Sequence, residues 1–428
     1  MGKVVQIEKP YIKTEKNHEV RLCANTVWDD GEKREELLLF FGVDEEWGKY
    51  FVTEYSDAFV LAILENAMNG GYDICFEQPL SEDLFYQLER YLIPTYSRKF
   101  KAFENIKLIG NISKEAINSQ NAVGTGFSAG VDSFHAILSN YNSKYTAHNV
   151  THLLLCVNGA ASTGMYEALS TRWFTEMMEK IEPLAEELHL KLIGVKSNID
   201  LLSLHRTILK GGDSLVTSSF VHALRKLFGT YYWASAFTSD VVDFCDCDGG
   251  YMEPLSLPWV SVRGLQFYHA GSECNRLEKV KLIADNSVVQ KGLSVCGNSY
   301  NCGRCFKCLR TMAELYSINK LDNFSEVFPV EDYKKHFVFR LANELAIDHP
   351  PFTTDILNSM KVNNVKVPIC VYLLKYLYYK PLYFFKAKLK NQKWIMKLYY
   401  RHHWDKKLFG LEHDEEYINA RLDGRINE

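Results

Sequence analysis

Short runs of β-forming residues separated by turn residues occupy the first 118 positions, and this pattern predicts a separate α+β domain. The runs at 18–28 and 36–44 are apolar and rich in β-formers, which predicts strands. A longer apolar segment, 57–71, predicts a helix that ends at its glycines. Another strand is expected over 72–80, and the segment 81–92 begins with a serine that predicts an N-capped helix. We identify no catalytic set of residues in this region.

A different pattern begins at residue 119 and extends to about 320, where buried-strand runs alternate with helical periodicity. The expected strands lie at 122–127, 150–157, 191–196 and 231–237, and the expected helices at 132–139, 165–190 and 218–229. This alternation predicts an α/β fold, a parallel sheet with helices on both faces. Ligands bind such sheets at the carboxyl ends of the strands, which is where the stretch 124–138 lies.

The last region, 321–428, is predicted to be helical, basic and aromatic. Residues 361–410 hold twelve Lys or Arg and one acid, Asp405, for a net charge of +11, although the whole chain carries −4. The main interpretation is a set of helices packed on the protein body with lysines reaching into water. An amphipathic surface helix that contacts anionic lipid, RNA or an acidic protein is the alternative. Pro381 is expected to interrupt any single long helix.

The composition is that of a soluble globular protein, because 47% of the 428 residues are hydrophobic and 24% are charged. A net charge of −4 argues against a general nucleic-acid-binding protein. The chain starts without an apolar leader and has no apolar stretch of about eighteen residues, so we expect no transmembrane segment and a cytoplasmic location. In that reducing compartment the eleven cysteines are expected to be thiols or metal ligands.

The stretch GTGFSAGVDSFHAIL, residues 124–138, fits three motifs. Residues 126–130 match the G-x-S-x-G elbow of serine hydrolases, but no HGGG-type oxyanion motif precedes it and no acid and histidine downstream stand out as partners. Residues 124–129 match the G-x-G-x-x-A dinucleotide fingerprint, but the next expected strand ends near Asn158 and not at an acid. Residues 128–133 differ by one residue from S-G-G-x-D-S, a pyrophosphate-binding loop.

The pyrophosphate-loop interpretation accounts for the most residues. Backbone N–H groups at a helix N-terminus attract phosphates, and small residues let the backbone approach them. Ser128 and Ser133 add hydroxyl donors, and Asp132 would orient the loop or recruit Mg²⁺. No Walker loop occurs in the sequence. A plain strand, turn and helix with a serine-rich cap is the alternative that this stretch alone leaves open.

Four cysteines within thirteen residues predict a structural metal site. Cys296, Cys302, Cys305 and Cys308 are spaced C-x5-C-x2-C-x2-C, and Gly303 permits a tight turn among them. Four thiolates complete the tetrahedral shell of Zn²⁺ and leave no position for water. An iron–sulfur cluster and four unrelated core cysteines are the alternatives.

Together, the FSAGVDS loop and the later CGRCFKC segment resemble the PP-loop ATP pyrophosphatase superfamily, whose members include GMP synthetase, asparagine synthetase and tRNA lysidine synthetase. The cysteine arrangement is most similar to that of the 7-cyano-7-deazaguanine synthases, whose four-cysteine zinc site follows the sheet in the same order. The resemblance covers roughly residues 119–315. Ala129 stands where the superfamily usually has a second glycine, and the first cysteine spacing is shorter than expected. The resemblance implies that ATP binds to Ser128, Ala129, Gly130, Val131, Asp132 and Ser133.

The resemblance also implies a reaction. Members of the superfamily cleave ATP between the α- and β-phosphates, transfer AMP to a carboxylate or carbonyl oxygen and release pyrophosphate, after which a nitrogen or sulfur nucleophile displaces AMP. For this chain it implies an amide- or nitrile-forming ligase that uses ATP, Mg²⁺ and structural Zn²⁺. The acceptor would be a small molecule or a modified base, and a partner protein could deliver ammonia.

Asp132 and Ser128 are the catalytic residues that the resemblance implies, and two basic residues are added as candidates. Arg276 and Lys279 precede the cysteine segment and lie three positions apart, which places them on one helix face. The resemblance implies that a basic residue near this point assists the phosphates. Two other functions stay open: a nucleotide-binding regulatory protein without turnover, and a nucleic-acid-modifying protein that uses the zinc ribbon and the basic tail. Lesser candidates, each also explained as a solvated turn or helix, are His269, Ser272, Lys307, Arg310, Gly211, Gly212, Asp213, Ser214, Asp240, Asp243, Asp246 and Asp248.

Overall fold

The computed structural model describes residues 2–157, 165–199, 201–202, 213–241, 249–296, 300–347 and 350–390. Its chain divides into two compact units. The first, which we call the sheet unit, comprises Met1–Ser128 and Ala136–Glu273. The second, the helical unit, comprises Ala129–His135 and Cys274–Glu428.

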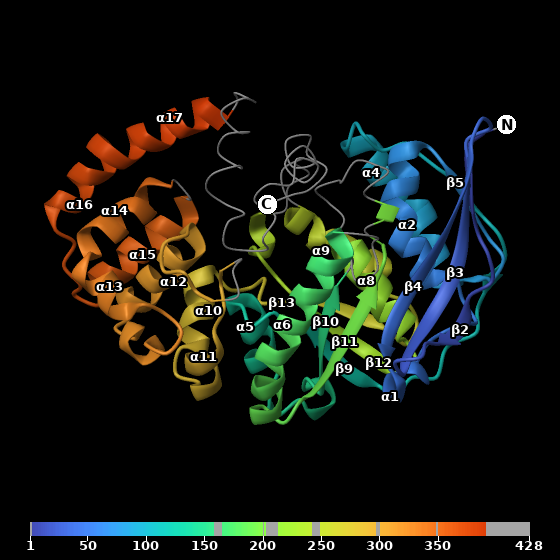
Figure 1. Cartoon of the computed structure of the whole chain (residues 1–428), viewed down its shortest axis with the longest axis horizontal. Coiled ribbons are helices and arrows are strands. Elements are labelled where there is room, and N and C mark those ends of the chain that lie inside the picture. The colour runs from blue at the N-terminus through green and yellow to red at the C-terminus, as the bar shows by residue number, and fades with distance from the viewer. Residues whose placement is uncertain are drawn as a thin grey trace. The chain divides into compact units, whose positions relative to one another are not determined.

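The sheet unit contains the parallel sheet that the alternating pattern predicts (Figure 1). Five strands run parallel to one another in the order β13-β12-β9-β10-β11. Their bounds are Ala122–Gly126 for β9, His152–Val157 for β10, Lys191–Ser197 for β11, Phe228–Ala234 for β12 and Gln266–Ala270 for β13. The chain is therefore an α/β protein whose sheet is mixed, because further strands join it at β11.

The N-terminal region continues this sheet and does not form a sheet of its own. β4 (Arg34–Asp44) pairs antiparallel with β11 through Gly42 and Phe41, opposite Lys196 and Ser197. The order then runs β4-β3-β1-β5-β7, and β2 pairs with β3. The bounds are Val4–Ile7 (β1), Tyr11–Thr14 (β2), Glu19–Asp29 (β3), Asp73–Phe76 (β5) and Leu108–Ile109 (β7), and β6 (Leu80–Ser81) forms a small separate pair with β8 (Ile112–Ser113). The expected boundary at residue 118 is absent from the described structure, because this pairing makes one sheet of both regions.

Helices cover both faces of the sheet. α6 (Met165–Glu187) covers one face of the parallel strands, where a side chain at Gly194 would collide with Phe174. On the opposite face, Ile193 and Val195 belong to a single apolar core shared with α2 (Asp57–Gly70) and α8 (Asp213–Ala223). The shorter helices of the unit are α1 (Glu45–Gly48), α3 (Glu82–Gln87), a π-turn (Leu88–Leu92), α4 (Ile93–Lys99) and α9 (Glu253–Val260). The common core of α2 and α8 explains why the N-terminal region is not separate.

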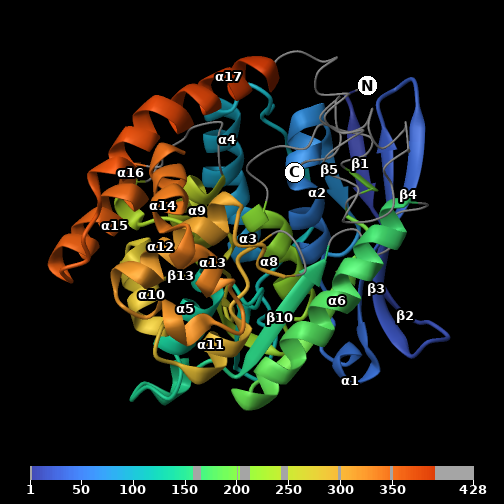
Figure 2. The same cartoon turned by 60° about the vertical axis from the view of Figure 1, so that its left-hand side comes forward.

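Apart from Ala129–His135, the helical unit begins at Cys274, ahead of the cysteine segment, and not near residue 321 as the sequence predicted. It includes the first turn of α5 (Val131–Ser139) together with the later helices (Figure 2). These are α10 (Arg276–Ile283), α11 (Ser287–Gly292), α12 (Phe306–Ser317), α13 (Val330–Lys335), α14 (Phe337–Ala346), α15 (Pro350–Val362), α16 (Ile369–Leu374), a π-turn (Lys375–Tyr379) and α17 (Lys380–Lys390). The described residues between 321 and 390 are mostly helical, and residues 348–349 and 391–428 lie outside the described part. Among the described helices, none combines the length and apolar character needed to cross a membrane.

Two local predictions are corrected by tertiary contacts. Ser81 begins α3, but its hydroxyl donates to the Asp57 carboxylate and does not cap the helix. The helix expected over 218–229 instead spans 213–223, because Phe228 and Gly229 already belong to β12. The Ser81 side chain is suited to cap a helix but binds Asp57 instead. Residues 228–229 fit a helical pattern but belong to a strand of the sheet.

Candidate functional site

The predicted phosphate loop connects β9 to α5. Ser128 is exposed. It is the last residue of Met1–Ser128, the first of the two stretches that make up the sheet unit. Ala129 adopts a left-handed conformation with φ +56°, and its carbonyl oxygen accepts a hydrogen bond from the Ser294 amide at 2.8 Å. The Ser133 hydroxyl donates to the Gly130 carbonyl at 3.0 Å and fixes the first turn of α5. The backbone thus takes the glycine-like turn that the motif requires, with alanine at the strained position.

Ala129 is fully buried, so its methyl group packs inside the protein and does not project into solvent. Ala129→Val is expected to destabilise the protein by about 2–4 kcal/mol, because a branched side chain disfavours positive φ and also overfills a closed site. Urea denaturation measures this loss. Ala129→Gly is the matched control, since the gain in backbone freedom and the lost methyl contact should cancel to within about 1 kcal/mol. Equal stability of the Val variant and wild type would contradict the observed turn.

Asp132 lies in the first turn of α5 and is held by both basic candidates. Its Oδ2 accepts a hydrogen bond from Arg276 Nη1 at 3.0 Å, and its Oδ1 accepts one from Lys279 Nζ at 3.2 Å. The Asp132 side chain is 29% exposed, whereas that of Lys279 is only 2% exposed. α10 begins at a capping box, in which the Asn275 side chain accepts from the Glu278 amide and Glu278 caps in return. This start orients Arg276 and Lys279, three residues apart, toward the same carboxylate.

Two buried glutamates extend the cluster behind Arg276. Glu314 Oε2 lies 3.6 Å from Arg276 Nε, and Glu344 Oε1 lies 3.9 Å from Arg310 Nε. Burial raises the pKa of Glu314 to about 7 and that of Glu344 to about 8. Burial thus favours the neutral form of both glutamates, which leaves less negative charge to balance the arginines of the cluster. An anion that approaches Asp132 would meet two cations already positioned by the fold.

Glu314 and Glu344 are not among the residues that the sequence singles out. A weak signal was available, because Arg310 and Glu314 are four residues apart on α12, the spacing of an ion pair on one helix face. That pattern ordinarily indicates a solvated surface, whereas both glutamates are 1% exposed. The burial arises from helix packing, which the sequence pattern does not display. Lys307, by contrast, is exposed, and Arg310 lies over the Phe352 ring at 3.9 Å.

The four predicted cysteines converge on one point in the helical unit. Their sulfur atoms all lie within 4.8 Å of one another, with Cys296 Sγ 3.6 Å from Cys302 Sγ and 3.7 Å from Cys305 Sγ. Sulfurs that share a tetrahedral Zn²⁺ with bonds of about 2.3 Å lie about 3.8 Å apart. The Cys305 and Cys308 amides donate to Cys302 Sγ and Cys305 Sγ, as backbone groups do around a bound thiolate. The cluster could therefore hold a metal ion such as zinc.

Local structure favours this cluster. Gly303 has φ +68°, and a Cβ there would come within 2.3 Å of the Pro329 ring, so the turn accepts only glycine. Cys305 is the N-cap of α12. The adjacent Cys296 sulfur raises the pKa of the Cys305 thiol to about 11, because neighbouring sulfurs disfavour a second thiolate. A cation would remove that penalty by binding the thiolates together.

The lesser candidates lie in other surroundings. In the sheet unit, His269 Nε2 is 2.9 Å from Glu253 Oε2, and the Ser272 hydroxyl donates to the His269 carbonyl. Ser214 lies in α8, where its hydroxyl is 3.3 Å from that of Ser256, and Asp240 lies in a short 3-10 turn. His269, Ser272 and Ser214 are thus held by contacts within the sheet unit, whereas Asp240 is exposed. Gly211, Gly212, Asp243, Asp246 and Asp248 lie outside the described residues.

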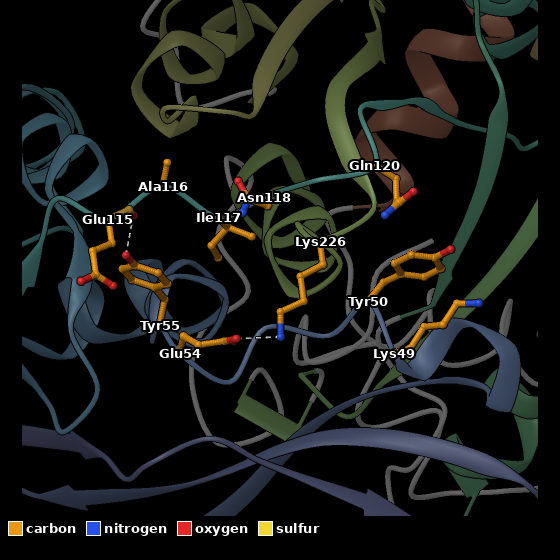
Figure 3. Close-up of a pocket in the computed structure, with 10 residues that line it drawn as sticks. All are labelled: Lys49, Tyr50, Glu54, Tyr55, Glu115, Ala116, Ile117, Asn118, Gln120 and Lys226. Atoms are coloured by element: carbon orange, nitrogen blue, oxygen red, sulfur yellow. Dashed lines mark hydrogen bonds and ion pairs between the residues drawn. The ribbon is translucent and has the colours of Figure 1, made fainter.

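A separate cavity of about 690 Å³ lies in the sheet unit (Figure 3). Lys226 Nζ on its wall pairs with Glu54 Oε1 at 2.8 Å, and the Tyr55 hydroxyl donates to the Glu115 carbonyl at 2.6 Å (Figure 3). None of the sequence-predicted site residues lines it. Two of its four charged side chains, Lys226 and Glu54, pair with each other, and the residues that the sequence singles out for chemistry lie elsewhere.

No family model, no curated protein and no solved structure matches the chain.

Proposed function

We propose that the chain is an ATP-dependent, AMP-forming enzyme of the PP-loop type that activates a carboxylate or carbonyl oxygen for attack by a nitrogen nucleophile. The observation that carries the proposal is Asp132, held in the first turn of α5 between Arg276 and Lys279. These three residues come from two distant segments, and the sequence motif and the basic helix face were each singled out for phosphate chemistry. The four-cysteine cluster in the same unit supports the resemblance on which the assignment rests.

The basic residues and the loop amides have defined parts in the proposed reaction, and Asp132 orients the two basic side chains. The substrate oxygen attacks the α-phosphorus of ATP, the bond between the α- and β-phosphates breaks, and pyrophosphate leaves with the bonding electron pair. Arg276 and Lys279 stabilise the negative charge of the leaving group, and the amides from Gly130 to Ser133 orient its oxygens. Mg²⁺, when bound, supplies further neutralisation of the phosphates. A nitrogen nucleophile, from free ammonia or a partner protein, then displaces AMP. Zn²⁺ in the cysteine cluster would have a structural role.

The test is product analysis with ATP labelled at the α-phosphate, Mg²⁺, ammonium and a cell metabolite extract. Wild type should form AMP or an AMP adduct together with pyrophosphate, and Asp132→Ala should reduce this by about a hundredfold or more, because it removes the carboxylate that orients Arg276 and Lys279. Asp285→Ala is the matched control, since Asp285 is an exposed acid of the same unit, paired only with Lys320 in the described structure. Formation of ADP, or equal AMP formation by the Asp132 variant, would refute the proposal.

A second candidate function has a specific observation in its favour. Both carboxylate oxygens of Asp132 already accept from Arg276 and Lys279, so that carboxylate is engaged and not open toward a Mg²⁺ ion. A nucleotide-binding protein that has lost turnover would tolerate this arrangement. Such a protein would bind ATP in a calorimetric titration and yet produce no AMP with any fraction of the extract.

A further inference from the structure

The helix at the end of the described chain has one face held by the protein. α16, the π-turn and α17 form an unbroken helical segment from Ile369 to Lys390 that runs along α14 (Figures 1 and 2). Val371 is fully buried against the unit, and the Tyr383 hydroxyl donates to Asn343 Oδ1 at 2.5 Å. These contacts fix which side of the segment faces outward.

The expected interruption at Pro381 does not occur. In the π-turn just before it, the Lys380 amide donates to the Lys375 carbonyl, five residues back. A proline ring collides with the carbonyl four residues back in a regular α-helix, and the wider turn relieves that collision. The segment therefore presents a single long surface, about 33 Å from end to end at 1.5 Å per residue.

The outward face of this segment is apolar and basic, and we call it the basic aromatic face. In α16 and the π-turn its exposed apolar residues recur three or four positions apart, at Ile369, Tyr372, Leu373, Tyr376 and Leu377, and Tyr378 is exposed as well. In α17, Phe384 and Phe385 follow seven and eight positions after Leu377. Leu377 is 77% exposed. Residues 361–390 contain seven lysines and no acid. Lys375 and Lys380 lie 5.4 and 5.5 Å from the Tyr376 ring, and Lys388 lies 4.7 Å from the Phe384 ring.

We propose that the basic aromatic face docks on the surface of an anionic lipid bilayer, lying in its interface. Lysines attract acidic headgroups, and the aromatic and leucine side chains between them enter the boundary with the acyl chains. The aliphatic members favour lipid over nucleic acid, because Ile369, Leu373 and Leu377 can neither stack on bases nor hydrogen-bond to phosphates. The charge favours an anionic surface, because no carboxylate interrupts the lysines over thirty residues.

The experiment is flotation of the full-length protein with vesicles of phosphatidylcholine alone or with 30% phosphatidylserine, a composition chosen as strongly anionic. We expect binding to the anionic vesicles, weak binding to the neutral ones, and release when salt is raised, because salt screens the charges. Lys386→Gln with Lys388→Gln should weaken binding by about 25-fold, roughly fivefold per lysine. Leu373→Ser with Leu377→Ser should weaken it by about tenfold or more without changing the circular dichroism, since both side chains are exposed.

Lys101→Gln with Lys114→Gln, two exposed lysines of the sheet unit, is the matched control and should bind like wild type. Absence of binding to anionic vesicles, or equal binding to neutral ones, would overturn the proposal. So would preferential binding to single-stranded RNA that depends on the lysines and not on the leucines. Self-association that the leucine substitutions abolish, measured by light scattering without lipid, would assign the face to a second copy of the chain and would likewise overturn it.

Discussion

Asp57→Ala is expected to destabilise the sheet unit by about 3–5 kcal/mol, because it leaves a buried arginine without its carboxylate. Asp57 Oδ2 accepts from Arg225 Nη1 at 2.9 Å, and Asp57 Oδ1 accepts from the Ser81 amide at 2.9 Å. The Asp57 and Arg225 side chains are 3% and 2% exposed. Asp57 is the first residue of α2 in the N-terminal region. Arg225 lies in the short connection between α8 and the parallel strand β12. The pair therefore ties together the two regions that the sequence placed in different domains.

Urea denaturation gives the loss of stability, and hydrogen exchange with mass spectrometry shows where it acts. Protection should fall together in β3 and β12, because both strands belong to one sheet and depend on one core. Loss of protection confined to β3 would show that the N-terminal region unfolds alone. The double variant Asp57→Asn with Arg225→Leu should be clearly more stable than Asp57→Ala, since it removes both buried charges together.

The parts of the fold that depend on local patterns could be predicted from the sequence. The apolar runs and the helical periodicity between them located β9, β10, β11 and α6 to within a few residues. The join between β4 and β11 could not be predicted, because it consists of an edge pairing of Gly42 and Phe41 with residues more than 150 positions away. The composition of a strand does not specify which strand will lie beside it. For the same reason the sequence predicts Ser81 as a helix cap, because its contact with Asp57 depends on the fold.

In the candidate site, too, the features that depend on local sequence could be predicted and those that depend on long-range packing could not. Asp132 and the Arg276/Lys279 pair were singled out by motif and by helical spacing, but their contact spans 144 positions and is visible only in the fold. The cysteines could be grouped from spacing alone, because ligands so close in sequence have few ways to lie apart. Glu314 and Glu344 could not be identified, since their position beside arginines depends on how the helices α12 and α14 pack. Local chemistry was thus predictable, and the buried charges that tune it were not.

Cys308→Ser is expected to abolish metal binding and to unfold much of the helical unit. Cys308 is fully buried in the first turn of α12. Leu309 and Met312, on the same helix, are also fully buried. Structural zinc contributes about 10–16 kcal/mol of apparent binding free energy in small zinc peptides near pH 7. Since a domain's whole stability is about 5–15 kcal/mol, loss of most of this contribution would be comparable to the stability of the unit.

Elemental analysis of the purified wild-type chain should show one zinc per chain, and Cys308→Ser should show little. Cys370→Ser is the matched control, because Cys370 is an exposed cysteine of α16 outside the cluster, and it should retain full zinc. Metal should also be lost as pH falls, since protons compete with the ion for the thiolates. Iron with acid-labile sulfide in place of zinc would assign the cluster to electron-transfer chemistry. Equal metal content in wild type and Cys308→Ser would leave the four sulfurs as thiols only, because a tetrahedral site cannot lose one of its four ligands without consequence.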